Sequence, residues 1–132
     1  MLIGVDLVKS AARLERAYDD SEGVTAAFNT NLLRRLETDL GAKVERDAFE
    51  HRATYKDDRQ RIEMQLVATR PTVIEIDGKR FEFDAGESIH TENSHKYSIE
   101  GFRELVKGTS LHPVKTWTDP EGLFSMHYLE TD

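Results

Sequence analysis

The chain opens with an apolar stretch followed by a short helical pattern. Residues 2–8 read Leu-Ile-Gly-Val-Asp-Leu-Val, a run typical of a short buried strand in a parallel sheet. A buried strand needs neighbours on both sides, so we expect the elements that flank it to lie outside this chain. Ser10 then offers an N-cap for a helix that continues to about Tyr18.

A second, longer helical pattern runs from Glu22 to about residue 40. Its apolar residues recur near helical spacing and predict one apolar face, made of Val24, Phe28, Leu32, Leu36 and Leu40. Gly41 follows directly and is well placed to end the helix in a left-handed conformation. Asn29 and Asn31 lie in the middle of this helix, where Asn is less favourable than better helix formers. A polar face toward solvent is the simplest interpretation of both amides.

Beyond residue 41 the pattern changes from helical spacing to the alternation of β-strands. Large or apolar side chains alternate over residues 49–55 and again over 62–66. The charged cluster Lys-Asp-Asp-Arg at 56–59 separates the two segments and is a plausible turn. These features predict two neighbouring antiparallel strands.

An Asp-Gly dipeptide at 77–78 is a strong signal for a hairpin with a two-residue turn. Folding about this turn sets Glu75 opposite Arg80, where the two charges can pair. The same register sets Ile74 opposite Phe81, on a face that we expect to be buried.

The last third of the chain predicts one helix and a final strand pair. The helix is capped by Ser98 and closes near Gly108. Strands are expected over 114–118 and 123–129, joined by the turn sequence Asp-Pro-Glu-Gly at 119–122. Because sheet and helices are interleaved along the chain, the predicted fold class is α+β.

The amino-acid composition limits the classes of partner and the chemistry that this chain can have. Its 132 residues are 38% hydrophobic and 33% charged, as expected for one polar globular domain. The net charge of −7 argues against nucleic acid or an anionic membrane as the main partner. The chain has no cysteine, which excludes disulfides and thiolate chemistry, and no apolar run long enough for a signal peptide or a membrane span. We therefore expect a cytoplasmic protein.

Residues 89–97, Ile-His-Thr-Glu-Asn-Ser-His-Lys-Tyr, carry the densest set of polar functional groups. If this segment is extended, Glu92 and Ser94 point the same way because they are two residues apart. A carboxylate and a hydroxyl so placed can accept hydrogen bonds from a small cationic ligand such as an ammonium or an imidazolium. The alternative is a solvated loop that follows the hairpin and has no ligand.

Two further side chains are candidate site residues. Tyr18 closes the first helix, where its phenol either projects into a cleft or caps the core. Met64 lies among alternating apolar residues, where it either lines an apolar pocket or fills the core. No phosphate-binding glycine loop is present, and the five histidines do not have the spacing of a zinc site on a helix, so we expect no metal.

Several segments together resemble the histidine-specific, S-adenosylmethionine-dependent methyltransferases, which trimethylate the α-amine of histidine in the first step of ergothioneine biosynthesis. The resemblance runs from about residue 2 to residue 129. The segments that carry it are Tyr-Asp-Asp at 18–20, Gly-Val-Thr-Ala-Ala-Phe-Asn-Thr-Asn-Leu-Leu-Arg-Arg at 23–35, Asp-Ala-Phe-Glu-His at 47–51, Arg-Ile-Glu-Met at 61–64, Thr91-Glu92 with Ser94, Lys96 and Tyr97, and Trp-Thr-Asp-Pro at 117–120 with Gly122 and Phe124.

The resemblance implies that this chain is the C-terminal part of such an enzyme. Residues 1–9 would be a remnant strand of the Rossmann-like domain, and residues 10–93 would be a substrate-binding insertion domain of helices and antiparallel sheet. Residues 94–132 would supply the last helix and strand pair of the Rossmann-like fold. The S-adenosylmethionine site would then lie in the preceding half, so we expect this chain alone to bind no cofactor and to be inactive.

The resemblance also implies roles for four residues. Tyr18 would contact the carboxylate or α-amine region of the substrate, and Met64 would form the apolar wall of its pocket. Glu92 and Ser94 would hold the imidazole, one at each ring nitrogen. No residue of this chain is expected to act as a catalytic residue, because methyl transfer from a sulfonium needs mainly a well-positioned amine. A related enzyme methylates a prenylated tryptophan, so a substrate other than histidine stays open.

Two hypotheses follow from these observations. The first is the substrate-binding and C-terminal segment of a histidine methyltransferase. The alternative is a non-catalytic amino-acid-binding or interaction module that retains the fold. In either case terminal strands with bare edges and uncovered apolar faces favour self-association, and we expect a homodimer.

Overall fold

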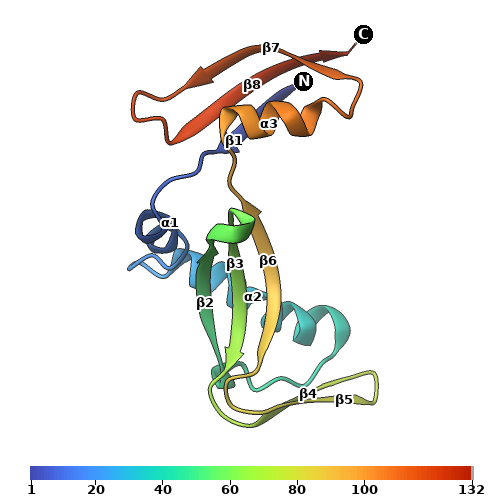
Figure 1. Ribbon diagram of the computed structural model, residues 1–132. Coiled ribbons are helices and arrows are strands. Elements are labelled where there is room, and N and C mark those ends of the chain that lie inside the picture. Colours follow the sequence, from blue (N-terminus) through green and yellow to red (C-terminus); the bar gives the residue numbers. More distant parts are fainter. Residues whose placement is uncertain (132) are drawn as a thin grey trace.

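In the computed structural model the chain forms two lobes, each built around its own antiparallel sheet (Figure 1). The structure describes residues 1–131, and Asp132, at the end of the third predicted region, lies outside the described residues. We call residues 11–95 the central lobe, and residues 2–6 together with 99–131 the terminal lobe. The observed class, three α-helices with antiparallel sheets, is the predicted α+β.

The terminal lobe is a three-stranded sheet with one helix on it. Strands β1 (Leu2–Asp6), β8 (Phe124–Thr131) and β7 (Leu111–Thr118) lie in that order, and helix α3 (Ile99–Val106) contacts β7. The buried residues that join them are Val5, Phe102, Val106 and Leu129.

One of the two neighbours of the first strand lies within this chain, although both were expected to lie outside it. β1 pairs antiparallel with β8 and lies at the edge of its sheet. Val5 is its one buried residue, whereas Leu2 is exposed, so the strand is half-buried rather than covered on both faces. An apolar run of this length does not distinguish these two situations.

The central lobe packs two helices on one face of the sheet β2 (Phe49–Lys56), β3 (Arg61–Ala68), β6 (Ser88–His95). Helix α1 (Ala11–Tyr18) buries Leu14 against Ile62 and Met64, and helix α2 (Val24–Leu40) buries Leu33 against Leu66. Because alternate residues of a strand share a face, these contacts place both helices on the same side of β3. Short 3₁₀ turns, Arg46–Ala48 and Asp57–Arg59, precede and follow β2.

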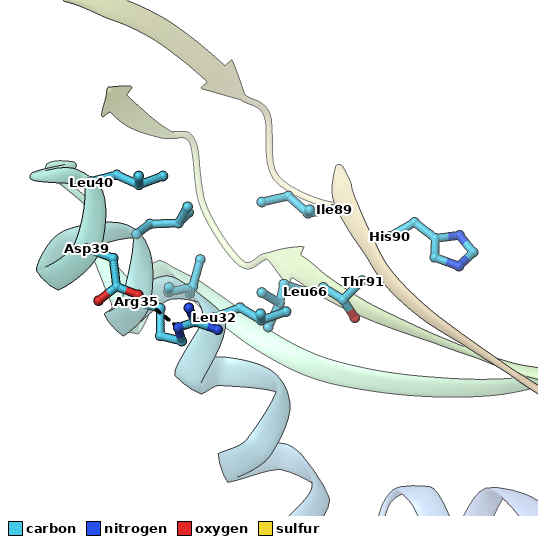
Figure 2. A pocket seen from close by; sticks show the side chains of 10 residues that line it. Leu32, Arg35, Asp39, Leu40, Leu66, Ile89, His90 and Thr91 are labelled. Atoms are coloured by element: carbon cyan, nitrogen blue, oxygen red, sulfur yellow. Dashed lines mark hydrogen bonds and ion pairs between the residues drawn. The ribbon is translucent and has the colours of Figure 1, made fainter. Parts of the chain in front are cut away.

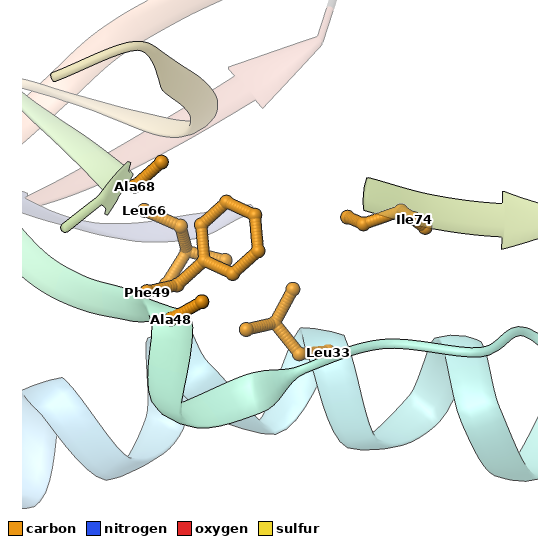
Figure 3. Close-up of a cluster of buried hydrophobic side chains, with 6 residues drawn as sticks. All are labelled: Leu33, Ala48, Phe49, Leu66, Ala68 and Ile74. Atoms are coloured by element: carbon orange, nitrogen blue, oxygen red, sulfur yellow. The ribbon is translucent and has the colours of Figure 1, made fainter. Parts of the chain in front are cut away.

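The largest buried cluster lies between α2, the start of β2 and the hairpin (Figure 3). It contains Leu33, Ala48, Phe49, Leu66, Ala68 and Ile74. Phe49 also meets Phe83 edge-on, with ring centroids 5.5 Å apart. This cluster anchors the hairpin to the sheet that carries the candidate site.

The predicted apolar face of the long helix is largely wrong, because of its five residues only Leu36 packs against the core. Val24, Phe28, Leu32 and Leu40 are all exposed, Phe28 by 64%, while Asn29 and Leu33 are buried against the sheet. The solvent-facing interpretation is therefore wrong for Asn29 and correct for Asn31. Helical spacing identifies an apolar stripe, but the sheet selects which stripe is covered. Gly41 ends the helix as predicted, with φ of 64°.

The hairpin has the predicted register. β4 (Thr72–Ile76) pairs with β5 (Lys79–Phe83), with Glu75 opposite Arg80 and their charged atoms 2.7 Å apart. Asp77 and Gly78 both have positive φ, as a two-residue turn of this kind requires. The expected burial of Phe81 is wrong, because its ring is 48% exposed while Ile74 is buried in the core. No helix within residues 1–131 is long and apolar enough to cross a bilayer.

Candidate functional site

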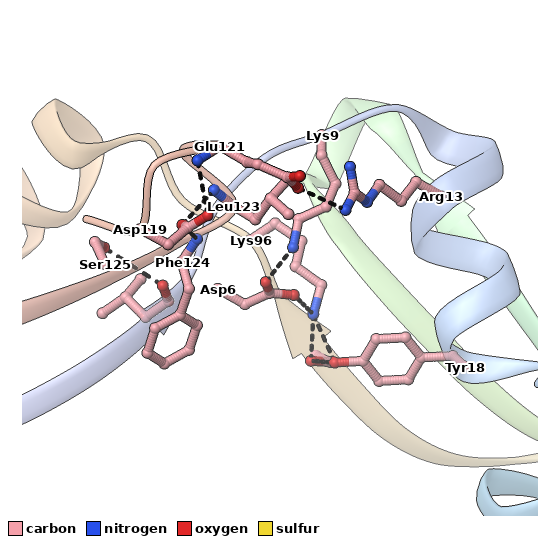
Figure 4. Close-up of polar contacts among 12 residues, drawn as sticks. Asp6, Lys9, Arg13, Tyr18, Lys96, Asp119, Glu121, Leu123, Phe124 and Ser125 are labelled. Carbon is pink, nitrogen blue, oxygen red and sulfur yellow. Dashed lines mark hydrogen bonds and ion pairs between the residues drawn. The ribbon is translucent and has the colours of Figure 1, made fainter.

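A polar cluster joins the end of α1 to the end of β6 (Figure 4). The Tyr18 hydroxyl lies 2.7 Å from Ser94 Oγ, although the two residues are 76 positions apart in the chain. The Lys96 ammonium donates to both oxygens, at 2.7 Å to Tyr18 and 2.8 Å to Ser94. It also lies 4.4 Å from the centre of the Tyr18 ring. Two of the four predicted site residues are thus brought together by a third polar group.

Lys96 also connects the two lobes. Its ammonium lies 2.9 Å from Asp6 Oδ2 at the end of β1, and its side chain is completely buried. Burial alone would raise the pKa of Asp6, but hydrogen bonds from Lys9 and Lys96 outweigh this effect and hold the pKa below its ordinary value. A second bridge between the lobes is the exposed ion pair of Arg13 with Glu121, at 3.1 Å.

Glu92 and Ser94 lie on the same face of β6 because they are two residues apart in a regularly paired stretch of the strand. Ser94 pairs with Ile62 and Glu92 with Met64, so both point to the side of β3 that α1 covers. Beyond this point the register shifts by one residue, which leaves Thr91 outside the pairing. The extended interpretation is therefore correct for residues 88–95, which form a strand and not a loop.

The Glu92 carboxylate is exposed and makes no hydrogen bond or ion pair with the residues that the structure describes. It is a free acceptor at the surface, two residues from a hydroxyl that is held in place. A small molecule with a polar ring that spans this gap would meet a carboxylate at one end and the Ser94 hydroxyl at the other.

Met64 is placed in the core next to these groups. It is 2% exposed and packs with Leu14 and Ile62, and Tyr18 covers the same cluster. Its backbone carbonyl accepts a hydrogen bond of 3.0 Å from Thr91 Oγ1, beside the bulge. Core packing, the simpler of the two interpretations, accounts for its burial, and through Tyr18 it supports the polar cluster.

Sequence reasoning missed a second polar network that lies behind Tyr18. His51 Nε2 donates to the Tyr18 carbonyl at 2.7 Å, and Asn29 Nδ2 donates to His51 Nδ1 at 2.9 Å. Asn29 Nδ2 also lies 3.1 Å from the Gln65 carbonyl, while its own Oδ1 is buried without a partner in the described structure. The signal was an amide at the centre of an otherwise good helix, which is unfavourable unless the amide bonds to something outside the helix.

A hollow in the central lobe does not include the polar cluster of Tyr18, Ser94 and Lys96 (Figure 2). It is an apolar groove of about 420 Å³ between the C-terminal half of α2 and the strands β3 and β6. Its lining includes Leu32, Leu36, Leu66 and Ile89, and the Arg35–Asp39 ion pair lies at its side. We place the candidate site at the polar cluster, because the groove has few polar groups that could orient a ligand.

Within residues 1–131 we find neither of two features that hold S-adenosylmethionine in a Rossmann-like fold. Rossmann-like sheets bind adenosine at the carboxyl ends of parallel strands, next to a glycine-rich turn. Within residues 1–131 all strands pair antiparallel, and the one parallel contact is a single bridge between Leu7 and Tyr97. The segment between β1 and α1 has no glycine. We therefore assign no residue of this chain to S-adenosylmethionine. Nor do the described residues contain a group of three or more His, Cys, Asp or Glu placed to hold a metal ion.

Comparison with known proteins gives one consistent result. A family model described as histidine-specific methyltransferase, SAM-dependent, matches residues 1–131. The histidine N-alpha-methyltransferase of Mycolicibacterium smegmatis is 42% identical over 128 residues, and the protein of the same name from Mycobacterium tuberculosis is 41% identical over 128 residues. Each alignment covers 96% of this chain and 40% of the relative. Ergothioneine biosynthesis protein 1 of Neurospora crassa is 32% identical over 121 residues, which cover 89% of this chain and 13% of that protein.

Proposed function

Because this chain belongs to the histidine-specific, SAM-dependent methyltransferase family, we propose that it forms the substrate-binding and C-terminal part of an enzyme that methylates the α-amine of histidine. In this proposal residues 10–93 form the substrate-binding domain, and Ser94, which follows directly, completes the histidine site. The sheet of the terminal lobe is the end of a Rossmann-like sheet, and β1 at its edge has one side free for a further strand. S-adenosylmethionine is then held by residues outside this chain.

One observation carries the proposal: Tyr18 and Ser94, predicted separately as substrate contacts, share a hydrogen bond of 2.7 Å. Glu92 lies on the same face of β6 with a free carboxylate. In the proposed complex Glu92 accepts from one ring nitrogen of histidine and Ser94 bonds the other. Tyr18 lies toward the carboxylate or α-amine of the bound histidine. Met64 packs in the buried cluster that the Tyr18 ring covers.

The residues of this chain bind and orient the substrate and take no chemical step. A sulfonium methyl group is already activated, so the protein has mainly to hold an unprotonated amine in line with it. Two ring contacts and one contact near the α-carbon fix the position and the rotation of a molecule as small as histidine. This is why we assign substrate-binding residues and no catalytic residue.

The test is a titration of the purified chain with L-histidine, followed by calorimetry or by NMR. We expect Glu92→Ala and Ser94→Ala each to weaken binding by roughly tenfold, because each removes one hydrogen bond to a ring nitrogen. Asn93→Ala is the matched control, since Asn93 pairs with Glu63 and faces the other side of the sheet. The proposed site is wrong if the two site variants bind histidine as well as the unmodified chain does.

The alternative function is a non-catalytic amino-acid-binding module. The two functions differ in whether a separate cofactor-binding half changes the activity of the chain. Under the first proposal the chain alone transfers no methyl group from S-adenosylmethionine to histidine, and adding a separately produced cofactor-binding half restores turnover. Under the alternative the chain binds histidine, and no such half changes that behaviour. Methyl transfer by the isolated chain would contradict both expectations.

We also propose that the isolated chain self-associates as a two-fold dimer. The observations behind this are the exposed apolar side chains of α2, with Phe28 and Val24 among them, and the free edge of β1. Sedimentation at micromolar concentration measures this directly, and a monomer across the accessible range would argue against it.

A further inference from the structure

The ammonium of Lys96 is completely buried and has three hydrogen-bonding or ionic partners. It contacts Asp6 Oδ2 at 2.9 Å, the Tyr18 hydroxyl at 2.7 Å and Ser94 Oγ at 2.8 Å. An ammonium has three N–H donors, so these contacts use all of them. Lys96 therefore has no donor left for a ligand, and it can influence a ligand only through the two hydroxyls and through its charge.

The hydroxyl protons of this cluster can be counted. Tyr18 and Ser94 each accept one hydrogen bond from Lys96, and they share one further hydrogen bond between themselves. The two hydroxyls have one proton each, so one proton lies between them and one is left for a ligand. A phenol, with a pKa of about 10, is a far stronger acid than an aliphatic alcohol and is the better donor. Tyr18 thus donates to Ser94, and the remaining proton belongs to Ser94.

In this arrangement both acceptor positions of Ser94 Oγ are filled, by Lys96 and by Tyr18. Ser94 can then donate to a ligand but cannot accept from it. The positive charge 2.8 Å away opposes a second cation at the same place. A neutral imidazole offers one N–H to Glu92 and one lone pair to Ser94, which fits both groups. An imidazolium offers N–H at both nitrogens, and one of them would face the Ser94 proton.

We propose that Lys96 is a positioning residue that makes Ser94 a hydrogen-bond donor toward the ligand and thereby selects the neutral form of the imidazole ring. This inference rests on the proposed function, since it concerns how the same site binds histidine. It contradicts the simpler expectation that the free carboxylate of Glu92 attracts the imidazolium. If the site selects the neutral ring, the affinity for histidine falls as the pH is lowered. If it attracts the imidazolium, the affinity rises.

The test is the affinity of the full chain for L-histidine between about pH 5 and about pH 8, the range in which an imidazole changes charge. We expect the affinity to fall about tenfold for each pH unit below the pKa of the ligand ring. The isosteric analogue 1,2,4-triazole-3-alanine, whose ring stays neutral in this range, should bind with the same affinity throughout. This ligand controls for protein groups that titrate.

That control is needed because several charged or titratable groups surround Lys96, Tyr18 and Ser94. They are Asp6, Lys9, Glu15, His51, Tyr55 and Glu92. Carboxylates, amines and phenols ordinarily titrate outside the measured range, and the one imidazole in this set is that of His51. A fall in affinity shared by both ligands would come from the protein, whereas a fall seen with histidine alone comes from the ligand ring.

Two variants test Lys96 itself. Lys96→Met keeps an unbranched side chain in the buried position, and Asp6 keeps Lys9 as a partner. In this variant Ser94 is free to accept, so the loss of histidine affinity at low pH should disappear or reverse. Tyr18→Phe also frees one acceptor position of Ser94 and leaves the Lys96–Asp6 pair in place, so it should relax the pH dependence even if Lys96→Met does not fold.

The outcomes are distinct. If the unmodified chain binds histidine equally well or better at low pH, the inference is wrong. It is also wrong if the affinity falls but both variants show the same fall, because Lys96 is then only structural. If no histidine binds at any pH, the proposed function is overturned, and this inference with it.

Discussion

Asn29 on α2 donates a hydrogen bond of 2.9 Å to Nδ1 of His51 on β2, and this contact joins the long helix to the strand next to Tyr18. The bond also fixes the tautomer of His51, because Nδ1 must be the acceptor and Nε2 then donates to the Tyr18 carbonyl. A helix residue that would ordinarily face solvent is here a buried polar contact.

Replacing this amide should therefore destabilise the fold. Asn29→Ala leaves His51 Nδ1 without its donor inside the protein, and we expect the free energy of unfolding to fall by about 1–3 kcal/mol in urea titrations. Asn31→Ala is the matched control on the same helix. Asn31 is exposed, so its replacement should change stability by no more than about 0.5 kcal/mol. Equal effects of the two variants would contradict the buried role of Asn29.

Two adjacent leucines of α2 test which face of the helix is covered. Leu33 is 1% exposed in the largest core cluster, so Leu33→Ala should lower the free energy of unfolding by about 2–5 kcal/mol. Leu32, one position earlier, is 40% exposed, and Leu32→Ala should cost much less. Urea unfolding of both variants measures the difference. A larger loss for Leu32 would show that the apolar stripe predicted from spacing is the covered one.

Asp20 should make the start of α2 sensitive to acid. Its two carboxylate oxygens accept hydrogen bonds from the backbone N–H groups of Thr25 and Val24, each at 2.9 Å, and these bonds lower the pKa of Asp20 to about 2. The folded pKa lies below the unfolded value, so the stabilisation is complete above the unfolded pKa and is lost as the pH falls through about 2.

The variant Asp20→Asn removes this ionisation, and the acid-dependent part of the helix stability should disappear with it. Circular dichroism during an acid titration measures the helix content. Asp19→Asn is the control, because Asp19 is exposed and the described structure gives its carboxylate no partner. An unchanged acid transition in Asp20→Asn would rule out this cap as its cause.

His127 should make the terminal lobe less stable in mild acid. Burial, together with the charge of Arg103, lowers the pKa of His127, whose ring also contacts Phe102 in a tilted arrangement with centroids 4.3 Å apart. Because the unfolded chain binds a proton more readily, stability is complete above about pH 6.5 and decreases as the pH falls toward the lowered pKa.

The expected measurement is the free energy of unfolding as a function of pH. His127→Gln removes the titrating ring and should flatten the profile below about pH 6.5. His95→Gln replaces an exposed histidine and should leave the slope unchanged. If both variants keep the slope of the unmodified chain, another group is responsible.

Much of the local structure could be predicted from the sequence because it depends on neighbours along the chain. The hairpin register follows from the turn at Asp77 and Gly78, and the end of α2 follows from Gly41. Ser98 caps α3 as its position predicts, accepting from the Gly101 N–H at 2.9 Å. Ser10 lies directly before α1 as predicted, but its side chain makes no capping hydrogen bond.

Some residues of the candidate site could likewise be predicted from the sequence, and one could not. Periodicity placed Glu92 and Ser94 on one face of an extended segment, and β6 has that geometry. The resemblance to a family added Tyr18 and Met64. Neither line of reasoning assigned a role to Lys96, because a lysine in a polar segment has the composition of a solvated surface residue.

What the sequence by itself determined is most of the helices and strands, the end of α2 and the pairing within one hairpin, because turn and cap residues act over a few positions. Tertiary structure alone decided which stripe of α2 is buried, that β1 pairs antiparallel with β8, and that Asp6, Tyr18, Ser94 and Lys96 meet. These outcomes depend on contacts between residues as far apart in the chain as Leu2 and Tyr128. Burial of a charge is favourable only where partners from other elements converge on it, and a sequence pattern does not record that convergence.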